Sequence, residues 1–228
     1  MATTSQRNYP MPFTRVELVV LCARDGELQV LLVQRQEAPH AGKWALPGGV
    51  VRIDLDANLE ASAQRVGQER LGCRLPNLTQ VVAVGGKARD PRAPWALSVV
   101  FASLVPPQLV LTAGKRVEAL QWQPVSRKVL WTQMAFDHGA LVRQAIGALR
   151  EQVAAMRFPK GWLPPEFTIP ELKALSEAIL GQALDKVTFR RRLEAGQLLV
   201  PVEGKFRAGG AFRPAQVYRW RATTSQSS

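Results

Sequence analysis

Several residue types that mark whole classes of protein are scarce in this chain of 228 residues. It has two cysteines, Cys22 and Cys73, and neither position indicates a disulfide framework or a thiol nucleophile. Its two histidines, His40 and His138, lie far apart with no cysteine or carboxylate at ligand spacing, so we expect no metal site. We expect His138 to have a structural role. This sparse use of cysteine favours a reduced, cytoplasmic setting.

Long apolar runs are also missing. No stretch of about 18 apolar residues is present, so we expect no membrane span. Residues 1–7 lack the apolar core of a signal peptide. A hydrophobic content of 46% is nevertheless ordinary for a protein with a real core, and the length fits one medium and one small domain.

Acidic residues are few: 18 Asp and Glu oppose 30 Lys and Arg, which gives a formal net charge of +12. Residues 1–150 hold 18 basic against 11 acidic side chains, and residues 151–228 hold 12 against 7, so both parts are basic. Such an excess points to a polyanion or a phosphate-bearing ligand. A charge that serves only solubility is the alternative, and net charge by itself does not separate the two.

The pattern over the first part of the chain predicts strands around two helices. Apolar runs at Arg15–Ala23 and Leu28–Val33 flank Asp25-Gly26, which is a strong hairpin signal. A first helix is expected from a cap at Asn58 to Leu71, before Gly72, and a second at Asp137–Met156. Further strands are expected near Val81–Val84, Ala96–Leu104 and Ala119–Pro124.

A glycine-rich turn, Gly48-Gly49, leads into the first helix. The stretch resembles the Nudix hydrolase signature, in which such a turn precedes a helix ending R-E-U-x-E-E-x-G-U, where U is apolar. The three carboxylates of that ending share one helix face and can hold the Mg²⁺ that pyrophosphate hydrolysis requires. The corresponding residues here are Val66, Glu69 and Arg70. We therefore predict a Nudix-like shape without hydrolase activity, in which Glu69 can pair with Arg65.

Residues near this turn are candidates for binding a ligand. Arg35 and Arg52 would face a pyrophosphate across the Gly48-Gly49 backbone, or else be solvated surface arginines. Trp44 would pack against the turn or stack on an adenine. The candidate ligand-binding residues are Arg35, Trp44, Gly48, Gly49, Arg52 and Arg89.

A second unit follows a proline-rich segment. Thr168 and Glu171 form a capping box with Pro170 in the first helical turn. After a tight turn at Gly181, Asp185 can cap a second helix. Two capped helices joined in this way are typical of a helix-turn-helix.

The second helix, residues 186–194, has an apolar side and a basic side. Phe189 and Leu193 point into a core. The opposite side carries candidate base readers and, at its flanks, candidate phosphate binders. The DNA-binding candidates on this helix are Lys186, Val187, Thr188, Arg190, Arg191 and Arg192. A solvated basic face on an ordinary helical hairpin is the alternative.

A hairpin is expected after this helix. Its strands would be Gln197–Glu203 and Ala215–Arg221, separated by a flexible basic tip at 204–214. This is the layout of a winged helix-turn-helix, in which the candidates Lys205, Arg207 and Arg213 would meet phosphates or a minor groove. The predicted fold class is α/β (α+β). It comprises a Nudix-like α/β/α sandwich at 10–156, a linker at 157–166 and a winged helix-turn-helix at 167–222.

Both parts together resemble the NrtR-type transcription regulators, over about Phe13 to Arg221. The matching runs are Gly42–Gly49, Arg89–Arg92, Phe136–His138, Pro165–Thr168 with Pro170–Leu172, and Asp185-Lys186 with Phe189–Arg191. The resemblance implies a Nudix-like domain that senses a small-molecule effector and a winged helix that binds double-stranded operator DNA as a homodimer. It also implies repression of NAD-metabolism genes, with ADP-ribose as the effector and no required cofactor, although sugar-responsive relatives share the layout.

Three functions fit these observations. The first is a ligand-responsive repressor, in which the Asp137–Met156 helix carries the signal from the sensor to the linker. The second is an atypical Nudix pyrophosphatase that draws its carboxylates from Asp54, Asp56 and Glu60. The third is a constitutive DNA-binding protein whose Nudix domain is only a dimerisation scaffold. The missing carboxylates and the winged-helix pattern together favour the first.

Overall fold

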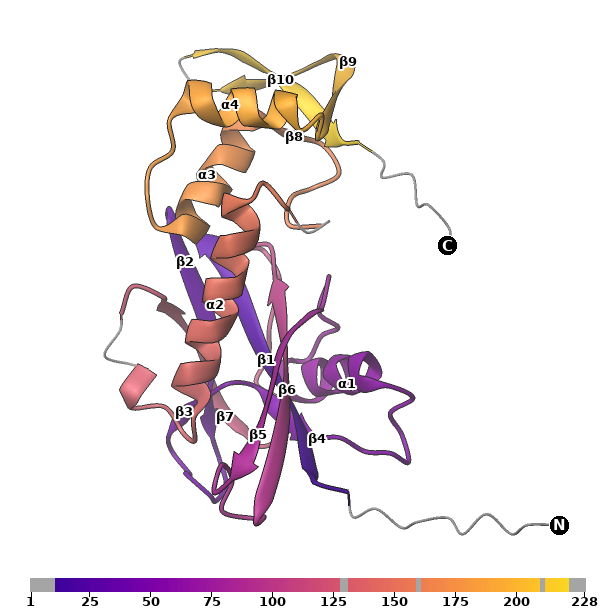
Figure 1. Ribbon diagram of the computed structural model, residues 1–228, viewed down its shortest axis with the longest axis vertical. Helices are drawn as coiled ribbons and strands as arrows, with labels where there is room; N and C mark the ends of the chain where they lie inside the picture. Colours follow the sequence, from indigo (N-terminus) through magenta and orange to yellow (C-terminus); the bar gives the residue numbers. More distant parts are fainter. Residues whose placement is uncertain (1–10, 128–130, 159–160, 210–211, 222–228) are drawn as a thin grey trace, which may run out of the picture.

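A sheet flanked by two helices and a smaller unit beyond its end make up the computed structural model, which describes residues 11–127, 131–158, 161–209 and 212–221 (Figure 1). The N-terminal elements are β1 (Phe13–Arg24), β2 (Glu27–Arg35), β3 (Trp44–Ala45), β4 (Gly48–Val50), α1 (Leu59–Leu71), β5 (Thr79–Lys87), β6 (Trp95–Leu104), β7 (Val117–Pro124) and α2 (His138–Ala154). The C-terminal elements are β8 (Phe167–Thr168), α3 (Ile169–Leu180), α4 (Lys186–Ala195), β9 (Leu199–Gly209) and β10 (Phe212–Trp220).

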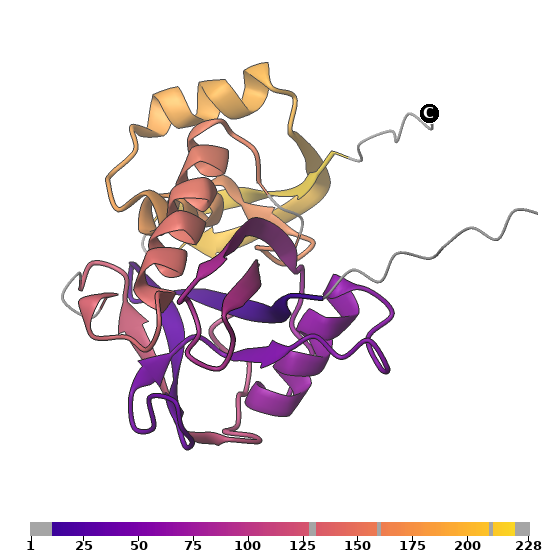
Figure 2. The ribbon, with the colours of Figure 1, turned by 60° about the horizontal axis from the view of Figure 1, so that its bottom comes forward.

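The N-terminal sheet lies between α1 and α2 (Figure 2). Its strand order within the described ranges is β3-β2-β1-β6-β5, with β4 also paired to β1 and β7 to β2. Alternate residues of β1 face opposite sides because side chains of a strand alternate. Leu18 and Val20 pack with α1, whereas Val19 and Leu21 pack with α2. The predicted α/β/α sandwich is confirmed.

The predicted ends of α1 are also confirmed. Asn58 Oδ1 accepts a hydrogen bond from the amide of Ala61 at 2.8 Å, which caps the first turn. Gly72 ends the helix in the left-handed region, with a φ of 71° that favours glycine. These local interactions fix where the helix starts and stops on the sheet.

The C-terminal unit is a winged helix-turn-helix. Thr168 and Glu171 form the predicted capping box at the start of α3, and Asp185 Oδ1 accepts from the amide of Thr188 at 2.8 Å to cap α4. Phe189 and Leu193 of α4 pack with Phe167 of β8 in a small core. The three strands pair in the order β8-β10-β9.

The wing differs from the prediction in its length. β9 runs to Gly209 and β10 starts at Phe212, so most of the predicted tip at 204–214 is strand. Pairing between the strands outweighs the glycine-rich composition of this segment. Arg207 and Ala215 lie opposite each other, and the side-chain amide of Gln216 donates to the carbonyls of Val202 and Lys205 at 2.8 and 3.1 Å. Lys205 and Arg207 therefore lie in a strand.

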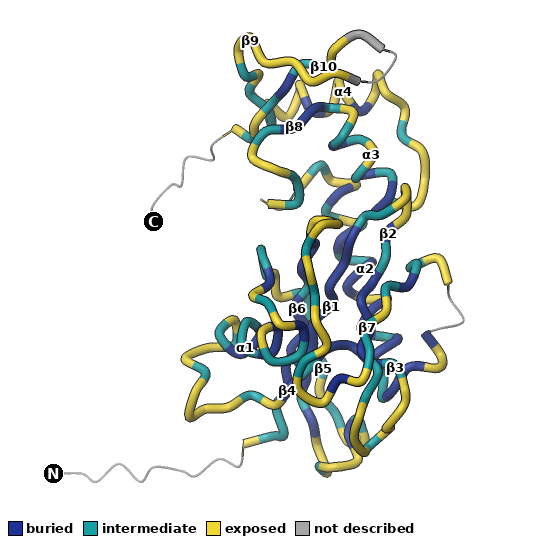
Figure 3. The backbone as a smooth tube through the Cα atoms, turned by 180° about the vertical axis from the view of Figure 1, so that it is seen from behind, coloured by how far each residue is buried: buried dark blue, intermediate teal, exposed yellow. Residues whose placement is uncertain are grey.

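The two units pack against each other through α2 and α3. Ile179 of α3 is fully buried in the same core cluster as Leu149 of α2. Arg150 Nε donates to the Ile179 carbonyl at 2.9 Å, and the guanidinium of Arg192 on α4 donates to the Ala154 carbonyl at 2.6 Å. Figure 3 shows mostly buried residues along the central strands and many exposed residues along β9. No helix in the described ranges is long and apolar enough to cross a membrane.

Phe167→Ala tests the small C-terminal core. Phe167 is fully buried and its ring lies 4.8 Å from that of Trp220. We expect a loss of about 3–5 kcal/mol in the free energy of unfolding of this unit, because the truncation leaves a cavity. Phe206→Ala is the matched control, since Phe206 is 61% exposed in the same unit, and it should cost less than about 0.5 kcal/mol. Urea titrations followed by circular dichroism measure both, and equal losses would contradict the assignment.

Candidate functional site

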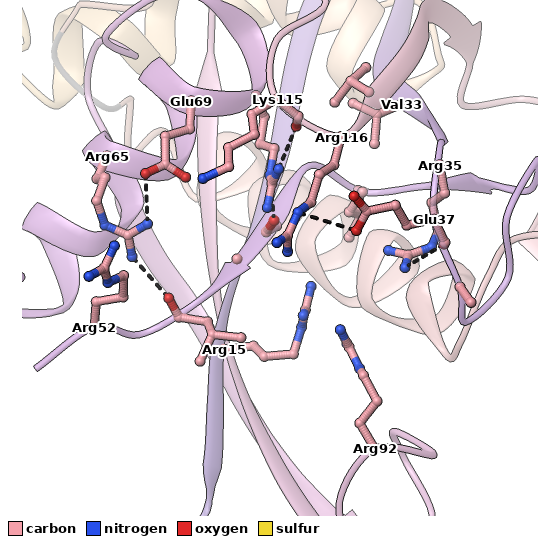
Figure 4. A pocket seen from close by; sticks show the side chains of 17 residues that line it. Arg15, Val33, Arg35, Glu37, Arg52, Arg65, Glu69, Arg92, Lys115 and Arg116 are labelled. Atoms are coloured by element: carbon pink, nitrogen blue, oxygen red, sulfur yellow. Dashed lines mark hydrogen bonds and ion pairs between the residues drawn. The ribbon is translucent and has the colours of Figure 1, made fainter.

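A pocket of about 220 Å³ opens beside the Gly48-Gly49 turn, between the end of β2, α1 and the segment that precedes β7. Its basic lining residues are Arg15, Arg35, Arg52, Arg65, Arg70, Arg92, Lys115 and Arg116. Its acidic lining residues are Glu37 and Glu69. Figure 4 shows the guanidinium groups of Arg15, Arg92 and Arg116 converging from separate segments. We call this site the arginine pocket.

Arg65 neutralises the carboxylates on the α1 side of the pocket. Its Nε and Nη2 each lie 2.7 Å from an oxygen of Asp56, and Nη1 donates to Glu69 at 3.3 Å. The predicted Arg65–Glu69 pair is thus confirmed, but Asp56 is the stronger partner. The hydrogen bonds from Arg65 lower the pKa of Asp56 from 3.8 to about 2.

Arg70 occupies the position at which the Nudix signature has its last carboxylate. Its Nε donates to the Gly48 carbonyl at 3.1 Å, and its Nη1 donates to the Lys115 carbonyl. Burial lowers the pKa of this guanidinium. Val66, at the position of the first carboxylate, is fully buried. A hydrophobic side chain, a carboxylate paired with Arg65 and a guanidinium are a poor donor set for Mg²⁺.

Three arginines crowd the opposite wall. Arg15 Nε donates to Glu17 at 2.8 Å in a buried pair. Burial acts to lower the pKa of Arg15, but the charge and hydrogen bond of Glu17 outweigh it and raise the pKa. Burial also lowers the pKa of Arg35, as do the charges of Arg15 and Arg92. An anion between these like charges would relieve the repulsion that lowers the pKa of Arg35.

Buried residues hold the turn under the pocket. A Cβ at Gly48 would collide with Glu17 Oε2, and a Cβ at Gly49 would lie 2.8 Å from Val66 Cγ2, so both positions need glycine. The amide of Leu46, just before the turn, donates to His138 Nδ1 at 2.9 Å. Burial lowers the pKa of His138, so the ring accepts this bond as the neutral form. The predicted structural role of His138 is confirmed.

The structure brings only part of the predicted ligand set together. Arg35, Gly48, Gly49 and Arg52 line the arginine pocket. Trp44 instead packs against the core under α2. The guanidinium of Arg89 binds Asp137 at 2.7 and 2.9 Å and the Val84 carbonyl at 2.8 Å. Neither Trp44 nor Arg89 is among the residues that line the pocket.

Sequence reasoning missed other residues of the pocket. These are Arg15, Arg65, Arg70, Arg92, Lys115 and Arg116. Arg15 could have been recognised from the sequence. Arg15 and Glu17 lie two residues apart at the start of an apolar strand, so their side chains share one face and can form an ion pair. Lys115 and Arg116 lie on a segment with no recognisable motif, and only folding brings them to the turn.

The exposed side of α4 is a second candidate site. Lys186, Arg190 and Arg191 are exposed, and Val187 is 74% exposed. Thr188 is exposed as well, whereas Phe189 and Leu193 are buried as predicted. Arg190 pairs with Glu194 at 2.8 Å. Within the described part of the chain, Arg191 makes no hydrogen bond or ion pair, so its guanidinium is available.

Three other predicted DNA contacts have protein partners in this structure. Arg192 reaches the Ala154 carbonyl at the end of α2, at 2.6 Å. Lys205 Nζ lies 2.8 Å from Glu166 Oε2, and the Arg207 guanidinium binds the Glu171 carboxylate. A phosphate would have to replace these carboxylates. Arg213 belongs to β10, but its side chain lies outside the described residues.

Two family models match the chain: the NUDIX domain over residues 12–144 and the NrtR DNA-binding winged helix domain over residues 160–220. The ADPR responsive transcriptional repressor NtrR of Acinetobacter baylyi is 34% identical over 220 residues, which cover 96% of this chain and 86% of that protein.

Solved structures agree with these matches. Shewanella oneidensis NrtR complexed with a 27mer DNA is 32% identical, with a TM-score of 0.73 and coverage of 91% of this chain and 93% of that chain. The NUDIX domain of Shewanella oneidensis NrtR complexed with ADP ribose is also 32% identical, with a TM-score of 0.57. That match covers 62% of this chain and 90% of the solved domain.

Asp56→Asn tests the ion pair between Asp56 and Arg65. The side chain of Asp56 is 2% exposed, so we expect the variant to lose about 2 kcal/mol of unfolding free energy at neutral pH. The pKa of Asp56 in the folded protein is lowered to about 2. The stabilisation by the pair is therefore complete above the ordinary pKa of 3.8 and is lost as the pH falls through about 2. Denaturant titrations should show a constant difference from wild type down to about pH 4, and a shrinking one below it. A difference that grows on acidification would contradict the assignment.

Proposed function

Because this chain belongs to the NrtR family of Nudix-related transcriptional regulators, we propose that it is a DNA-binding repressor whose degenerate Nudix domain senses ADP-ribose or a related nucleotide. The relatives that support this are a repressor described as ADPR responsive and structures complexed with DNA and with ADP ribose. Genes of NAD metabolism are the proposed targets, and the cytoplasm is the proposed location.

The crowding of Arg15, Arg35 and Arg92 is the observation that carries the ligand assignment. Arg15 pairs with Glu17 and Arg92 with Asp90, whereas Arg35 has no carboxylate partner within the described residues and its pKa is lowered by the other two charges. A diphosphate between them would relieve this repulsion and accept several charge-assisted hydrogen bonds. A neutral sugar offers no such charge. The pocket chemistry therefore favours a nucleoside diphosphate over the sugar effector considered from the sequence.

Binding is proposed to occur without hydrolysis. Arg70 places a fixed positive charge at the Gly48 carbonyl, where the signature would place a metal-binding carboxylate. The carboxylates of the alternative pyrophosphatase do not replace it. Asp54 and Asp56 are bound by Arg52 and Arg65, and Glu60 is exposed in the first turn of α1 and is not among the pocket-lining residues.

The DNA-binding surface is proposed to be the exposed side of α4 together with the wing. Arg191 and Lys186 would contact the duplex first, since the wing cations Lys205 and Arg207 must leave Glu166 and Glu171. We propose a homodimer, because two recognition helices can then meet half-sites about 34–36 Å apart, or a multiple of this spacing. The ligand would weaken repression by binding the DNA-free arrangement more tightly than the DNA-bound one.

A titration with Arg35→Gln tests the function directly. ADP-ribose should weaken binding of the dimeric protein to a duplex selected from a random pool, with EDTA present and without detectable hydrolysis. Arg35→Gln should reduce ADP-ribose affinity by about 1.5–3 kcal/mol, because a hydrogen bond to a charged group is lost. Calorimetry, light scattering and mobility shifts measure affinity, dimerisation and DNA release.

Arg24→Gln is the matched control for this titration. Like Arg35, Arg24 donates to a backbone carbonyl and lies over an aromatic ring, but it does so at Pro107 and Trp122, away from the pocket. Its loss should leave ADP-ribose affinity unchanged. DNA affinity that is indifferent to ADP-ribose and related diphosphates would instead favour the constitutive, scaffold function.

Arg191→Ala tests the DNA-binding surface. Arg191 is exposed opposite Phe189 and Leu193, so its removal should leave the fold intact while weakening binding to the selected duplex by about 1–3 kcal/mol. Mobility shifts on the selected and a scrambled duplex separate base reading from phosphate binding. An unchanged preference for the selected duplex would rule out Arg191 as a base reader.

A further inference from the structure

Two motifs that are distant in the sequence meet behind the arginine pocket. Arg89 belongs to the Arg89–Arg92 run and Asp137 to the Phe136–His138 run, and their side chains form a bidentate ion pair at 2.7 and 2.9 Å. The same Arg89 guanidinium donates to the Val84 carbonyl of β5 at 2.8 Å. The pair therefore attaches the residue that starts α2 to the β5–β6 segment of the sheet.

Phe136 provides a surface on which two pocket arginines rest. The guanidinium carbon of Arg35 lies 5.1 Å from the centre of the Phe136 ring, and that of Arg92 lies 5.8 Å from it. Arg92 also pairs with Asp90 at 2.5 Å and lies 5.2 Å from the Phe13 ring, so Arg35 depends more on Phe136. Both arginines line the pocket, and each comes from a different segment. An aromatic ring attracts a cation through its negative face, so one ring can hold two guanidiniums that would otherwise repel each other.

The position of Phe136 in the chain connects this contact to α2. Phe136 has a φ of 54°, a left-handed conformation, and is followed at once by Asp137, the cap residue of α2. On either side of it, the Ala135 amide donates to the Trp44 carbonyl at 2.8 Å, and His138 accepts from the Leu46 amide at 2.9 Å. The start of α2 is thus bonded to the Trp44–Leu46 segment, of which Leu46 lines the pocket.

The other end of α2 is bonded to the DNA-binding unit. The Ala154 carbonyl in its last turn accepts from Arg192 of the recognition helix α4 at 2.6 Å. One turn earlier, Arg150 donates to the Ile179 carbonyl of α3 at 2.9 Å. A displacement at the start of α2 would therefore reach α3 and α4 through hydrogen bonds and a shared core rather than through a free linker.

We propose that Phe136 is a positioning residue of the arginine pocket and that the Arg89–Asp137 pair passes pocket occupancy to α2. This rests on the proposed function, and it names the residues that perform the coupling. A diphosphate draws Arg35 off the ring, because Arg35 donates only to backbone carbonyls and a full negative charge attracts it more strongly than an aromatic face. The Phe136 turn then loses its contact with Arg35, and α2, held to that wall by Arg89 and Asp137, shifts against α3 and α4.

Phe136→Leu tests the positioning role. Leucine keeps an apolar side chain against the core but removes the aromatic face, so the Kd for ADP-ribose and for inorganic pyrophosphate should each rise about fivefold or more. Phe158→Leu is the matched control, since Phe158 stacks on Trp220 at 5.4 Å, outside the pocket, and its loss should leave both Kd values unchanged. Equal affinities of the Phe136→Leu variant and wild type would overturn the positioning role.

Asp137→Asn tests the coupling role. The Asp137 side chain makes no capping hydrogen bond, so the variant loses the charge of the Arg89 pair and keeps the helix start. The ratio of DNA affinities without and with saturating ADP-ribose should be about 5 to 150 in the wild-type protein. In the variant it should fall below about twofold, while ADP-ribose affinity and ligand-free DNA affinity stay close to wild type.

Lys173→Gln is the control for the coupling test. It breaks the similarly half-buried Lys173–Glu177 pair of 2.6 Å within α3, which is not one of the hydrogen bonds between α2 and the DNA-binding unit, and should keep the full ratio. No effect of ADP-ribose on wild-type DNA binding would refute the proposed function, and this inference with it. A normal wild-type response that Asp137→Asn retains in full would refute the inference alone.

Discussion

The close approach of the Gly48-Gly49 backbone to its neighbours is the constraint on which the rest of the structure depends. Gly48 pairs with Glu17 of β1, and Gly49 pairs with Val16. Neither glycine has room for a Cβ, because Glu17 Oε2 lies against the first and Val66 of α1 against the second. The turn is therefore clamped between a strand and a helix. This fixes α1 over the sheet and leaves the arginine pocket beside the turn.

The charges around this turn follow from the residues of α1 that lie where the Nudix signature has carboxylates. A helix that offers Val66 and Arg70 in place of two carboxylates has an apolar contact for Gly49 and a guanidinium for the Gly48 carbonyl. The turn is thus held by side chains of the protein. The remaining acids, Asp56 and Glu69, are bound by Arg65. The other wall has an excess of guanidiniums, whose repulsion an anionic ligand can relieve.

The same turn is joined to the DNA-binding unit through α2. His138 accepts from the Leu46 amide at one end of this helix, and the Ala154 carbonyl accepts from Arg192 at the other. The segment at 157–166 is described from the sequence as a linker, yet Phe158, Leu163 and Trp162 pack against the cores of the two units. Side-chain packing therefore sets how the N-terminal unit and the recognition helix α4 are placed relative to each other in this structure.

Interactions between residues three or four apart could be predicted from the sequence. The caps Asn58, Thr168 and Asp185, the Arg65–Glu69 pair and the buried Phe189–Leu193 side of α4 need only helical geometry. The comparison of Val66, Glu69 and Arg70 with the three carboxylates of the Nudix signature is equally local, since one helix sets their spacing. The length of the wing was wrong in the prediction, because cross-strand pairing of Arg207 with Ala215 depends on the partner strand.

The partners of charged side chains were decided only by the tertiary structure. Arg89 was expected at the ligand and binds Asp137, which is 48 residues away, and Lys205 was expected at DNA and binds Glu166, which is 39 residues away. Arg15, Arg92 and Arg116 enter the pocket from three separate segments. A charged side chain has no periodicity that reveals its partner, because ion pairs depend on distance in space and are indifferent to distance along the chain. The sequence by itself determined the helices, their ends and the residues at positions 66, 69 and 70 of α1, whereas the fold decided which arginines share the pocket.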